Sequence, residues 1–470
     1  MLAGDFTFSL KPKIEKVNLG EEQVSALKIL EDFISGDEQC ITLSGSAGTG
    51  KTTIIRELLD YLDDEQISYA LAAPTHKAKL VIEALTGSEA QTIHQLLALS
   101  PNIEIFALDY RDLVFETSKS SYALLTIPYN GVVIVDEASM INDDLFQLLL
   151  DKCSASKSKI IFVGDIKQIQ PVKSDRTSKV FTLPNTITLT KIYRQESDSP
   201  VLSILATLRD RPLYEFHTLK GVRDSINVTQ SPRDFILAAQ PCLKETVENR
   251  NVLNCKLLAY TNARVTSLNQ VARKVIFGED SNNEFNKGEI LVGCDNFKYD
   301  QNEFWNSLDY IIVNTPVKIS KRIPNFDQSL IGYNLELYDT VYKTTNTIFV
   351  LSRDNDINVL SNLVNLIETT RLKAVDLKAK GKRNVELWKR YFETINSFAC
   401  TFNLFYDNRV IKRKTFDYGY AITVHRSQGS SNNKVFVDMS NIGKQQDEEE
   451  LRQLQYVAIS RTRGDVFILV

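Results

Sequence analysis

The sequence predicts an α/β protein built on parallel sheets, and three observations support this fold class. Apolar, strand-like runs alternate with helix-like segments from residue 40 to about 195, which is the pattern of a parallel sheet layered with helices. A glycine-rich loop joins the first of these strands to the first of these helices. A second alternating unit begins near residue 196, is interrupted, and resumes near residue 415. With 470 residues, the chain is long enough for about three domains.

Composition places the chain among ordinary globular proteins. It is 43% hydrophobic and 24% charged, and no apolar stretch reaches the roughly 18 residues of a membrane span. The first residues lack the apolar core of a signal peptide, so we expect a cytoplasmic protein. The formal net charge of −4 argues against a chain that is basic throughout, but a local basic groove would suffice for phosphate contacts. The six cysteines form no C-x-x-C pair, so we expect scattered thiols rather than a metal site or a disulfide framework.

The glycine-rich loop, GSAGTGKT at 45–52, matches G-x-x-x-x-G-K-[ST] at every fixed position. Glycines let backbone N–H groups turn inward around a phosphate, and the helix that follows adds its positive end. The sequence therefore predicts a nucleotide site in which Lys51 reaches the β- and γ-phosphates and Thr52 binds Mg²⁺. The binding residues of this site are Gly45, Ser46, Ala47, Gly48, Thr49, Gly50, Lys51, Thr52 and Thr53.

Two further apolar runs end in polar residues suited to the same site. GVVIVDEASM ends its apolar run at Asp136 and Glu137. We expect Asp136 to hold the water shell of Mg²⁺ and Glu137 to orient and deprotonate the attacking water. KIIFVGDIKQIQPV leads to Gln168, whose neutral amide could distinguish a triphosphate from a diphosphate. A strand capped by solvated acids is the commoner arrangement, but the phosphate loop in the same chain favours the catalytic interpretation.

The order and spacing of these motifs resemble those of superfamily 1 helicases, from about residue 18 to the C-terminus. The segments that carry the resemblance are LAAPTHKAK at 71–79, QTIHQLL at 91–97, DEAS at 136–139, GDIKQIQPV at 164–172, LTKIYRQ at 189–195, LLAYTNARVTSLNQVAR at 257–273, DYGYAITVHRSQGSS at 417–431 and QLQYVAISRTR at 453–463. The wording YAITVHRSQG is most similar to the RecD-like and Dda-like branch, superfamily 1B. The resemblance implies two RecA-like motor domains that use ATP and Mg²⁺ to move 5′→3′ on single-stranded DNA.

The resemblance also implies roles for residues outside the phosphate loop. Gln23 would contact adenine, because an amide both donates and accepts; taken alone, it would be a surface residue at a helix start. Arg194 and Arg461 would act as arginine fingers on the γ-phosphate from the far side of an interdomain cleft. DNA contacts would fall on short polar segments whose donors suit phosphate oxygens. These DNA-binding residues are Pro74, Thr75, His76, Lys77, Thr92, His94, Thr261, Asn262, Thr423, His425, Ser427 and Gln428.

Pattern and resemblance together divide the chain into motor domains and insertions. The predicted parts are a first RecA-like motor domain at 1–195 with an inserted hairpin at about 98–130, a second RecA-like motor domain at 196–287 and 415–470, and an insertion at 288–414 with an SH3-like β-barrel and a helical extension. Within that extension, residues 371–390 hold eight Lys or Arg and two acidic residues, a local net charge of +6. This stretch is either a contact for DNA or a partner, or a solvated helix face.

The inserted hairpin carries the candidate for opening a duplex. Phe115, in YRDLVFETSK, matches the wedge aromatic of Dda-like helicases, and an aromatic ring can stack on the end base pair. Phe106 or Tyr110 could take this role instead. The alternative interpretation is that Phe115 is buried and anchors the hairpin to the motor core.

We therefore expect an ATP-dependent DNA helicase that acts on single-stranded DNA and duplex junctions. We expect it to be a monomer, to meet replication proteins, and to work in the cytoplasm of a bacterium or a phage-infected host. One alternative is a translocating ATPase that displaces proteins without unwinding. Another is an RNA helicase of the same superfamily, which would need contacts to the 2′-OH group.

Overall fold

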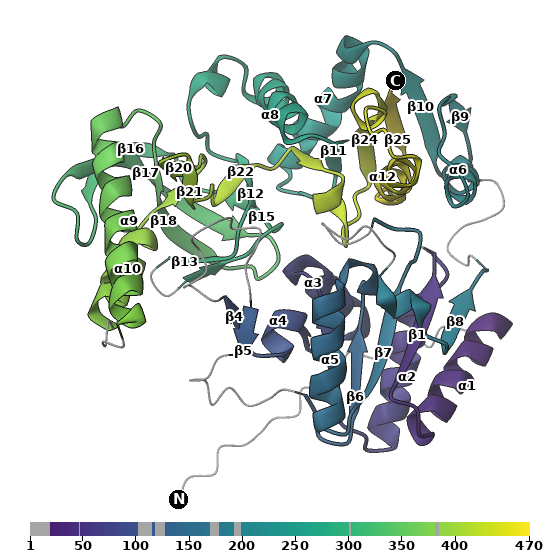
Figure 1. Cartoon of the computed structure of the whole chain (residues 1–470). Coiled ribbons are helices and arrows are strands. Elements are labelled where there is room, and N and C mark those ends of the chain that lie inside the picture. The colour runs from purple at the N-terminus through teal and green to yellow at the C-terminus, as the bar shows by residue number, and fades with distance from the viewer. Residues whose placement is uncertain are drawn as a thin grey trace, which may run out of the picture. The chain divides into compact units, whose positions relative to one another are not determined.

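The computed structural model describes residues 19–46, 48–101, 115–117, 127–169, 178–191, 199–299, 302–380 and 385–470. Contacts divide the chain into two compact units, Met1–Ala98 with Lys119–Glu196 and Leu99–Ser118 with Ser197–Val470. Figure 1 shows the helices and strands of each unit. All six cysteines are free thiols. Among the helices that the structure describes, none is long and apolar enough to cross a membrane.

The first unit is built on a six-stranded sheet in which every neighbouring pair is parallel (Figure 1). The strand order is β3 (Ala90–Thr92), β2 (Tyr69–Ala73), β6 (Val132–Val135), β7 (Lys159–Gly164), β1 (Cys40–Gly45) and β8 (Thr186–Leu189). The central strands are largely buried; β6 is an unbroken apolar run in which all four residues are buried. Because the strands are parallel, the residues that follow them meet along one edge of the sheet.

Helices cover both faces of this sheet. They are α1 (Glu21–Ser35), α2 (Lys51–Asp64), α3 (His76–Thr86), α4 (Ile93–Leu96) and α5 (Asp143–Ala155). Successive strand residues point to opposite faces. Ile161 and Val163 join a buried cluster with residues of α1, α2 and α3. Phe162, between them, meets Phe146 of α5 with ring centroids 5.5 Å apart, so α5 covers the other face.

The second unit contains a parallel sheet of similar design. Its order is β23 (Ala421–Thr423), β11 (Cys255–Ala259), β24 (Lys434–Asp438), β25 (Val466–Leu469), β10 (Ser225–Thr229) and β9 (Leu219–Lys220). Only β9, at the edge, runs antiparallel to its neighbour among these described strands. The helices of this layer are α6 (Pro200–Leu208), α7 (Pro232–Glu248), α8 (Asn262–Phe277), α11 (Met439–Ile442) and α12 (Glu448–Ser460).

A third sheet, mainly antiparallel, lies in the predicted insertion at 288–414, except for its last strand, which follows residue 414. Its order is β19 (Ala399–Cys400), β18 (Thr345–Leu351), β17 (Ser329–Asp339), β15 (Asp309–Ile312), β12 (Ile290–Gly293) and β22 (Phe416–Tyr418), with β16 (Val317–Arg322) also pairing with β17. The chain enters this sheet at β12 and leaves it at β22, and these two strands pair directly, Leu291 opposite Tyr418. Two-stranded ladders accompany it, β13 (Phe297–Tyr299) with β14 (Asn302–Phe304) and β20 (Leu404–Tyr406) with β21 (Arg409–Lys412). The SH3-like description of this region stays a prediction.

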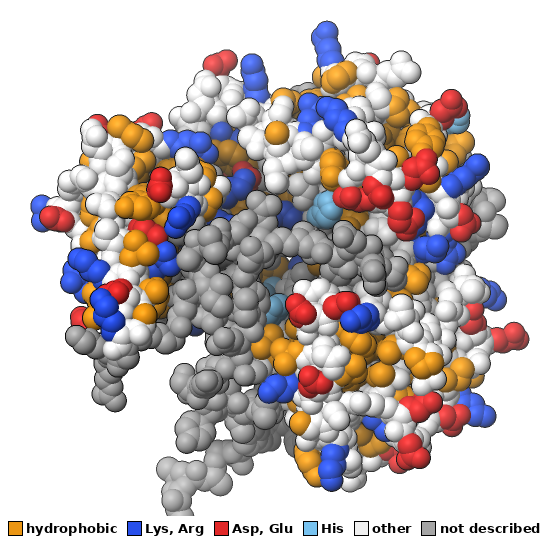
Figure 2. All heavy atoms as spheres, viewed as in Figure 1, with side chains coloured by type: hydrophobic (Ala, Val, Ile, Leu, Met, Phe, Trp, Pro, Cys, Tyr) orange, Lys and Arg blue, Asp and Glu red, His pale blue; other side chains and the backbone are white. Residues whose placement is uncertain are grey.

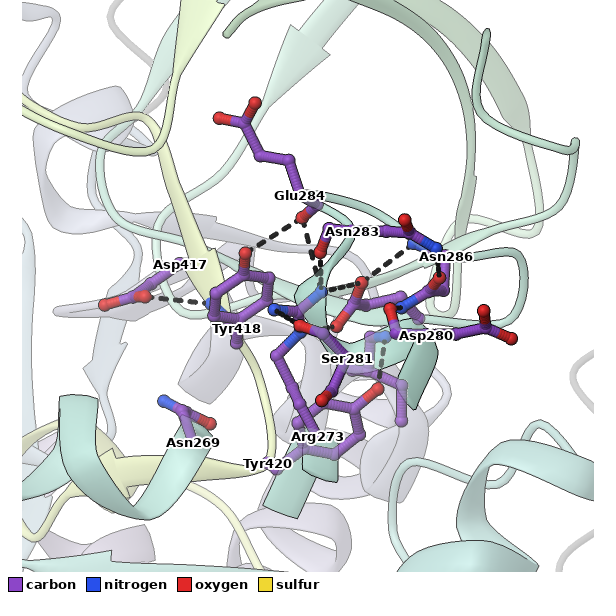
Figure 3. A network of polar contacts seen from close by, with 12 residues as sticks. Asn269, Arg273, Asp280, Ser281, Asn283, Glu284, Asn286, Asp417, Tyr418 and Tyr420 are labelled. Atoms are coloured by element: carbon purple, nitrogen blue, oxygen red, sulfur yellow. Dashed lines mark hydrogen bonds and ion pairs between the residues drawn. The ribbon is translucent and has the colours of Figure 1, made fainter. Parts of the chain in front are cut away.

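Buried charges join the third sheet to the second. Arg273 of α8 forms an ion pair with Glu289, which directly precedes β12, and its guanidinium lies 4.1 Å from the ring centre of Tyr418 (Figure 3). Lys256 of β11 bonds to Asp309 of β15 at 2.9 Å. All four charged side chains are nearly inaccessible to solvent. Buried pairs of this kind tolerate the loss of one partner poorly, so they fix how the insertion sits on the second parallel sheet.

The described part of the basic stretch falls on or next to α9 (Ile357–Ala379) and α10 (Val385–Ile395), which pack against each other. Several of its charges are paired within a helix. The pairs are Arg371–Glu368 at 2.7 Å, Lys380–Asp376 at 2.6 Å and Lys389–Glu393 at 3.9 Å. Figure 2 shows basic and acidic side chains mixed on this part of the molecule, at its left. The Lys380–Asp376 and Lys389–Glu393 pairs are exposed, which is typical of a solvated helix face, whereas Arg371 and Glu368 are buried.

The inserted hairpin is described only at its base. β4 (Leu99–Pro101) and β5 (Phe115–Thr117) pair antiparallel, with Phe115 opposite Pro101. The two other wedge candidates, Phe106 and Tyr110, lie outside the described residues. Contacts group residues 99–118 with the second unit, whereas the sequence places the hairpin in the first motor domain. The predicted domain boundaries therefore stay predictions.

Candidate functional site

The strand order of the first sheet arranges the predicted site residues along its carboxyl edge. Lys51 follows β1, Asp136 and Glu137 follow β6, and Gln168 follows β7. These three strands are neighbours, in the order β6-β7-β1. His76 and His94 follow β2 and β3 at the other end of the same edge. One edge therefore carries the nucleotide candidates on one side and the first set of DNA candidates on the other.

The phosphate loop has the backbone that its glycines predict. Gly48 and Gly50 have φ of 86° and 84°, in the left-handed region that side chains disfavour. Gly50 is also the N-cap of α2, so the helix begins where the loop ends. Lys51 folds back over the loop, with Nζ 2.6 Å from the carbonyl oxygen of Gly45 and 3.1 Å from that of Ser46. Ala47 lies outside the described residues.

Gln23 lies against this loop rather than at a free surface. Its side chain is only 4% exposed. Its Nε2 donates to the carbonyl oxygen of Thr49 at 3.1 Å, and its Oε1 accepts from the N–H of Gly20 at 2.9 Å. An amide has two donors and two acceptor lone pairs, so one of each remains beyond these bonds. This is compatible with the predicted contact to adenine, which stays a prediction.

The acidic pair follows β6 in an unusual backbone conformation. Glu137 has φ of 51°, and a non-glycine residue in this region is a pointer to function. Burial raises the pKa of Asp136 to about 7, the negative charge of Glu137 adds to the rise, and Lys51 opposes it. The site thus holds more negative charge than its surroundings stabilise. A divalent cation would relieve this excess, so the donor set of Asp136 and the Thr52 hydroxyl fits Mg²⁺.

On the nucleotide side of this edge, two buried polar atoms lack a hydrogen-bond partner among the described residues. They are Oε1 of Gln168, whose side chain is 5% exposed, and Oγ of Ser139, which is fully buried. Buried polar groups are nearly always bonded, so unsatisfied ones are expected where a ligand or water binds. Sequence reasoning chose Gln168 but missed Ser139, although it stands within the quoted DEAS motif. Its burial next to two acids could not be read from the motif alone.

The two predicted arginine fingers differ in what the structure describes. Arg461 follows α12 and is 6% exposed. Its guanidinium donates to the carbonyl oxygens of Val457 and Ser430, both at 3.1 Å, and to the hydroxyl of Ser460 at 2.8 Å. It is therefore held firmly in the second unit. Arg194 lies outside the described residues.

Neutral histidines stand among the DNA candidates of the first unit. Burial lowers the pKa of His76 to about 4, with the nearby charges of Lys79 and His94 adding to the effect. Burial also lowers the pKa of His94. Thr75 caps α3 through its hydroxyl, which accepts from the N–H of Ala78 at 3.1 Å. Near neutral pH these imidazoles could donate hydrogen bonds to DNA without carrying charge.

The remaining DNA candidates on this edge are Thr92, Pro74 and Lys77, which lie at or next to the starts of α4 and α3. The Thr92 hydroxyl accepts from the N–H of Gln95 at 3.2 Å, and the side-chain Oε1 of Gln95 accepts from the N–H of Thr92 at 2.9 Å. This reciprocal arrangement is a capping box. Pro74 and Lys77 flank the capped turn of α3. The same short stretches thus shape the backbone and present polar groups.

The DNA candidates of the second unit also lie together, at the carboxyl ends of two neighbouring strands. Thr261 and Asn262 follow β11, and Thr423, His425, Ser427 and Gln428 lie at or after the neighbouring strand β23. Burial lowers the pKa of His425, whose ring lies 6.2 Å from that of Tyr260. The Ser427 hydroxyl donates to the carbonyl oxygen of Val424 at 2.6 Å, so its proton is used in a hydrogen bond within its own loop.

Two residues of this edge were missed by sequence reasoning. Asn441, after β24, accepts from the N–H groups of Tyr260 and Thr261 at 2.9 and 3.0 Å. It fixes the turn that carries the predicted contacts. Tyr260 supplies an aromatic face beside His425. The spacing of 180 residues between Thr261 and Asn441 left no local signal for this pairing.

Both units resemble proteins that are already known. A model of the AAA domain matches residues 18–221, and a model of the UvrD-like helicase C-terminal domain matches residues 418–469. The chain is 28% identical over 482 residues to "ATP-dependent DNA helicase dda" of Enterobacteria phage T4, covering 96% of this chain and 99% of that protein. It is 32% identical over 194 residues to "ATP-dependent RecD2 DNA helicase" of Deinococcus radiodurans, covering 41% of this chain and 24% of that protein.

A solved structure shows the same fold. The Pif1 helicase from Candida albicans has a TM-score of 0.50 at 18% identity, covering 96% of this chain and 94% of that chain. The predicted fold class, two parallel α/β units with an insertion in the second, is confirmed.

Proposed function

Because this chain belongs to superfamily 1B, the group of the Pif1-like and RecD-like helicases, we propose that it is an ATP-dependent DNA helicase. It would move 5′→3′ on single-stranded DNA and separate duplex strands, with ATP hydrolysis as the energy source. The superfamily predicted from the motifs is thereby confirmed. The 5′→3′ direction of movement is supported by the family alone, since no contact among the described residues bears on it.

One observation carries the proposal: a single carboxyl edge holds both sets of candidate residues in the first unit. The phosphate loop and the acidic pair follow β1 and β6, while His76 and His94 follow β2 and β3. Neighbouring strands of one sheet therefore connect the nucleotide candidates to the DNA candidates, so a structural change caused by ATP hydrolysis could reach the DNA candidates through these strands. This arrangement suits an enzyme that converts hydrolysis into movement.

On the nucleotide side, the chain's own residues divide the chemistry. Lys51 would neutralise charge on the β- and γ-phosphates. Mg²⁺, held by Thr52 and Asp136, would supply charge stabilisation to the phosphate oxygens. Glu137 would orient the attacking water and accept its proton, while the Gln168 amide would contact the γ-phosphate. Arg194 and Arg461 would complete the site as fingers.

On the DNA side, neutral polar groups would hold the phosphate backbone. Apart from Pro74 and the cationic Lys77, the candidates in both units are hydroxyls, amides and histidines whose pKa burial lowers. Such contacts position a strand without selecting its sequence. Tyr260, beside His425, would add a surface for stacking.

The remaining parts of the proposal rest on sequence and family. The two parallel sheets would be the motor domains, and the sheet at 288–414 would be the inserted domain. The hairpin at 98–130 would carry the wedge, with Phe115 as its aromatic. We further propose a monomer that meets single-stranded DNA, duplex junctions and replication proteins in a bacterial or phage-infected cytoplasm.

A strand-displacement assay tests this function against the alternatives. Duplexes with a 5′ DNA tail, a 3′ DNA tail or a 5′ RNA tail are compared at equal concentration with ATP and Mg²⁺. The proposal expects unwinding only with the 5′ DNA tail, and none by Lys51→Ala as the matched control. DNA-stimulated ATP hydrolysis without unwinding would identify a translocase. Unwinding from the RNA tail alone would identify an RNA helicase.

A further inference from the structure

A groove of about 930 Å³ lies at the edge of the first sheet, between α1 and the strand β8. Among the described strands, β8 is the last on its side of the sheet, and Figure 1 shows α1 beside it. The strand side of the groove is the chain at 184–189. The helix side is one face of α1, because its residues recur every three or four positions. These residues are Glu22, Ser25, Ala26, Ile29, Asp32 and Phe33.

The outer side of β8 offers backbone groups to a further strand. β8 pairs in parallel with β1, and the N–H of Thr42 donates to the carbonyl oxygen of Asn185 at 2.9 Å. Alternate residues of a strand direct their backbone groups to opposite sides, so Thr186 and Thr188 direct theirs away from β1. Both threonines are exposed. An edge of this kind can accept another chain as a strand.

The open stretch of this edge has the length of a short extended peptide. After β8, the N–H groups of Thr190 and Lys191 donate to the carboxylate of Glu22, both at 2.8 Å, so these groups are already bonded. Glu22 and Phe33, at the two ends of the lining face of α1, are about 16 Å apart along the helix at 1.5 Å per residue. About five residues of extended chain cover this distance.

The lining is apolar in the middle and acidic at one end. Ile29 is 44% exposed, and Ile187, across the groove, is half-buried. Three exposed carboxylates lie where α1 ends and the chain leads to β1, beside the start of β8. They belong to Asp32, Asp37 and Glu38. The ammonium of Lys159 bonds to carbonyl oxygens at this end of α1 and offsets part of their charge, but the described lining contains no Lys or Arg.

We propose that this groove binds an extended, basic peptide of a partner protein, which adds to β8 as a further strand. The peptide backbone bonds to Thr186 and Thr188, as in other cases of strand addition. Its apolar side chains contact Ile29 and Ile187, and its Lys or Arg residues lie at the acidic end of the groove. The inference does not depend on the proposed function, since none of these residues belongs to the nucleotide or DNA candidates.

Labelled peptides test strand addition without altering the protein. The probe is a fluorescein-labelled peptide of alternating Thr and Val with two Lys at one terminus, made in both orientations, and fluorescence anisotropy measures its binding to the full chain. We expect the better of the two to bind at least about tenfold more tightly than the same peptide with Glu in place of Lys. N-methylation of alternate peptide residues should abolish binding for one set and spare the other, because only one set of N–H groups faces β8.

Substitutions in the chain test whether the peptide binds in this groove. Asp37→Lys combined with Glu38→Lys should weaken binding of the Lys peptide about tenfold and strengthen binding of the Glu peptide. The control Asp64→Lys changes an exposed acid at the end of α2, outside the groove, and should alter neither. Thr188→Pro removes an outward N–H, which edge strands tolerate, and should also weaken binding. All of these variants should keep Tm and DNA-stimulated ATP hydrolysis near those of the wild type.

Four results would overturn the inference. Two of them are equal binding of the Lys and Glu peptides, and wild-type binding by the folded groove variants. The third is binding of the Lys peptide only after residues 1–18 are deleted, which would mean that a segment of this chain fills the groove. The fourth is a change of oligomeric state in Ile29→Asp, measured by size-exclusion chromatography, which would mean that a second copy fills it. None of these results bears on the proposed helicase function, which the strand-displacement assay tests separately.

Discussion

The ammonium group of Lys51 lies 2.6 Å from the carbonyl oxygen of Gly45, so the lysine bridges the loop from which it projects. We expect Lys51→Ala to abolish ATP turnover and to leave the fold intact. The side chain is half-buried and its bonds go to loop carbonyls, so its removal costs little packing. Charge stabilisation at the phosphates contributes several kcal/mol, so its loss lowers kcat by a factor of at least about 10²–10³. ATPase rate and Tm measure the two effects.

A matched control is available on another helix of the same unit. Lys28→Ala removes an exposed lysine of α1 and should leave ATP turnover and Tm unchanged. A folded Lys51→Ala variant that hydrolyses ATP at the wild-type rate would show that the loop has another role.

Glu137→Gln should separate binding from hydrolysis. Glutamine preserves the shape at this left-handed position but cannot accept the proton of the attacking water. We expect normal binding of ATP and single-stranded DNA, with hydrolysis slower by about 10²–10⁴. Fluorescence anisotropy with labelled DNA and a labelled nucleotide measures binding, and single-turnover hydrolysis measures the chemical step. Loss of ATP binding to the same degree would mean that Glu137 is structural.

His76 should make stability depend on pH. Its pKa is about 4 in the folded chain because of burial and the nearby positive charges of Lys79 and His94, against an ordinary value of 6.5. Between these values the unfolded chain binds a proton that the folded chain does not, so the free energy of unfolding falls as pH is lowered. At pH 5 the expected loss is roughly 1–2 kcal/mol.

Urea denaturation at pH 7 and pH 5 measures this loss, with His76→Gln as the comparison. The variant should lose less stability between the two pH values than the wild type. His217→Gln, at an exposed position, should behave as the wild type. An equal pH dependence in all three proteins would refute the assignment to His76.

Phe115→Ala should distinguish a wedge from a core residue. Only the backbone of Phe115 is described, in β5 opposite Pro101. If the ring is the wedge, DNA-stimulated ATPase and Tm should stay near normal while duplex unwinding is lost, because stacking on the end pair is worth about 1–3 kcal/mol. If ATPase, Tm and unwinding fall together, the residue is part of the core. Tyr129→Ala, which removes an exposed ring, is the control and should unwind normally.

Arg273→Met should destabilise the second unit strongly. It would leave Glu289 buried without its ion-pair partner, at a cost of about 3–5 kcal/mol. Replacing both partners with methionine should recover part of this loss, since no buried charge then remains, although Asn286 would still lose a backbone bond to Glu289. Denaturant unfolding measures both variants. A double variant no more stable than the single one would show that the pair is not the cause.

Sequence reasoning performed well where a motif and its structural context coincide. The phosphate loop, the acidic pair and Gln168 all follow strands of one parallel sheet, and their meeting at one edge follows from that topology. β-strands were also expected in the insertion, where β15, β16, β17 and β18 lie. In both cases the pattern lies within a few consecutive residues.

What the sequence could not predict depends on contacts between distant residues. Gly164, at the end of the neighbouring strand β7, packs directly on the backbone of Ser139. A Cβ added at Gly164 would lie only 3.3 Å from the Ser139 nitrogen. Glu22 accepts hydrogen bonds from Thr190, which lies 168 residues away in the sequence. The ion pairs of Lys256 and Arg273 likewise join separate sheets. No local periodicity encodes such pairings.

The pairing of β12 with β22 has a consequence for how this protein could be shortened or rebuilt. Since Leu291 stands opposite Tyr418, the two ends of the inserted sheet lie about 5 Å apart, and a tight turn could close the gap if the insertion were excised. Excision of the residues between Leu291 and Tyr418 would, however, remove Asp309 and leave the buried ammonium of Lys256 without its carboxylate, whereas Glu289, which precedes Leu291, would stay with Arg273. The insertion could therefore be removed without a wide gap in the chain, but the shortened protein would need Lys256 replaced by an apolar residue.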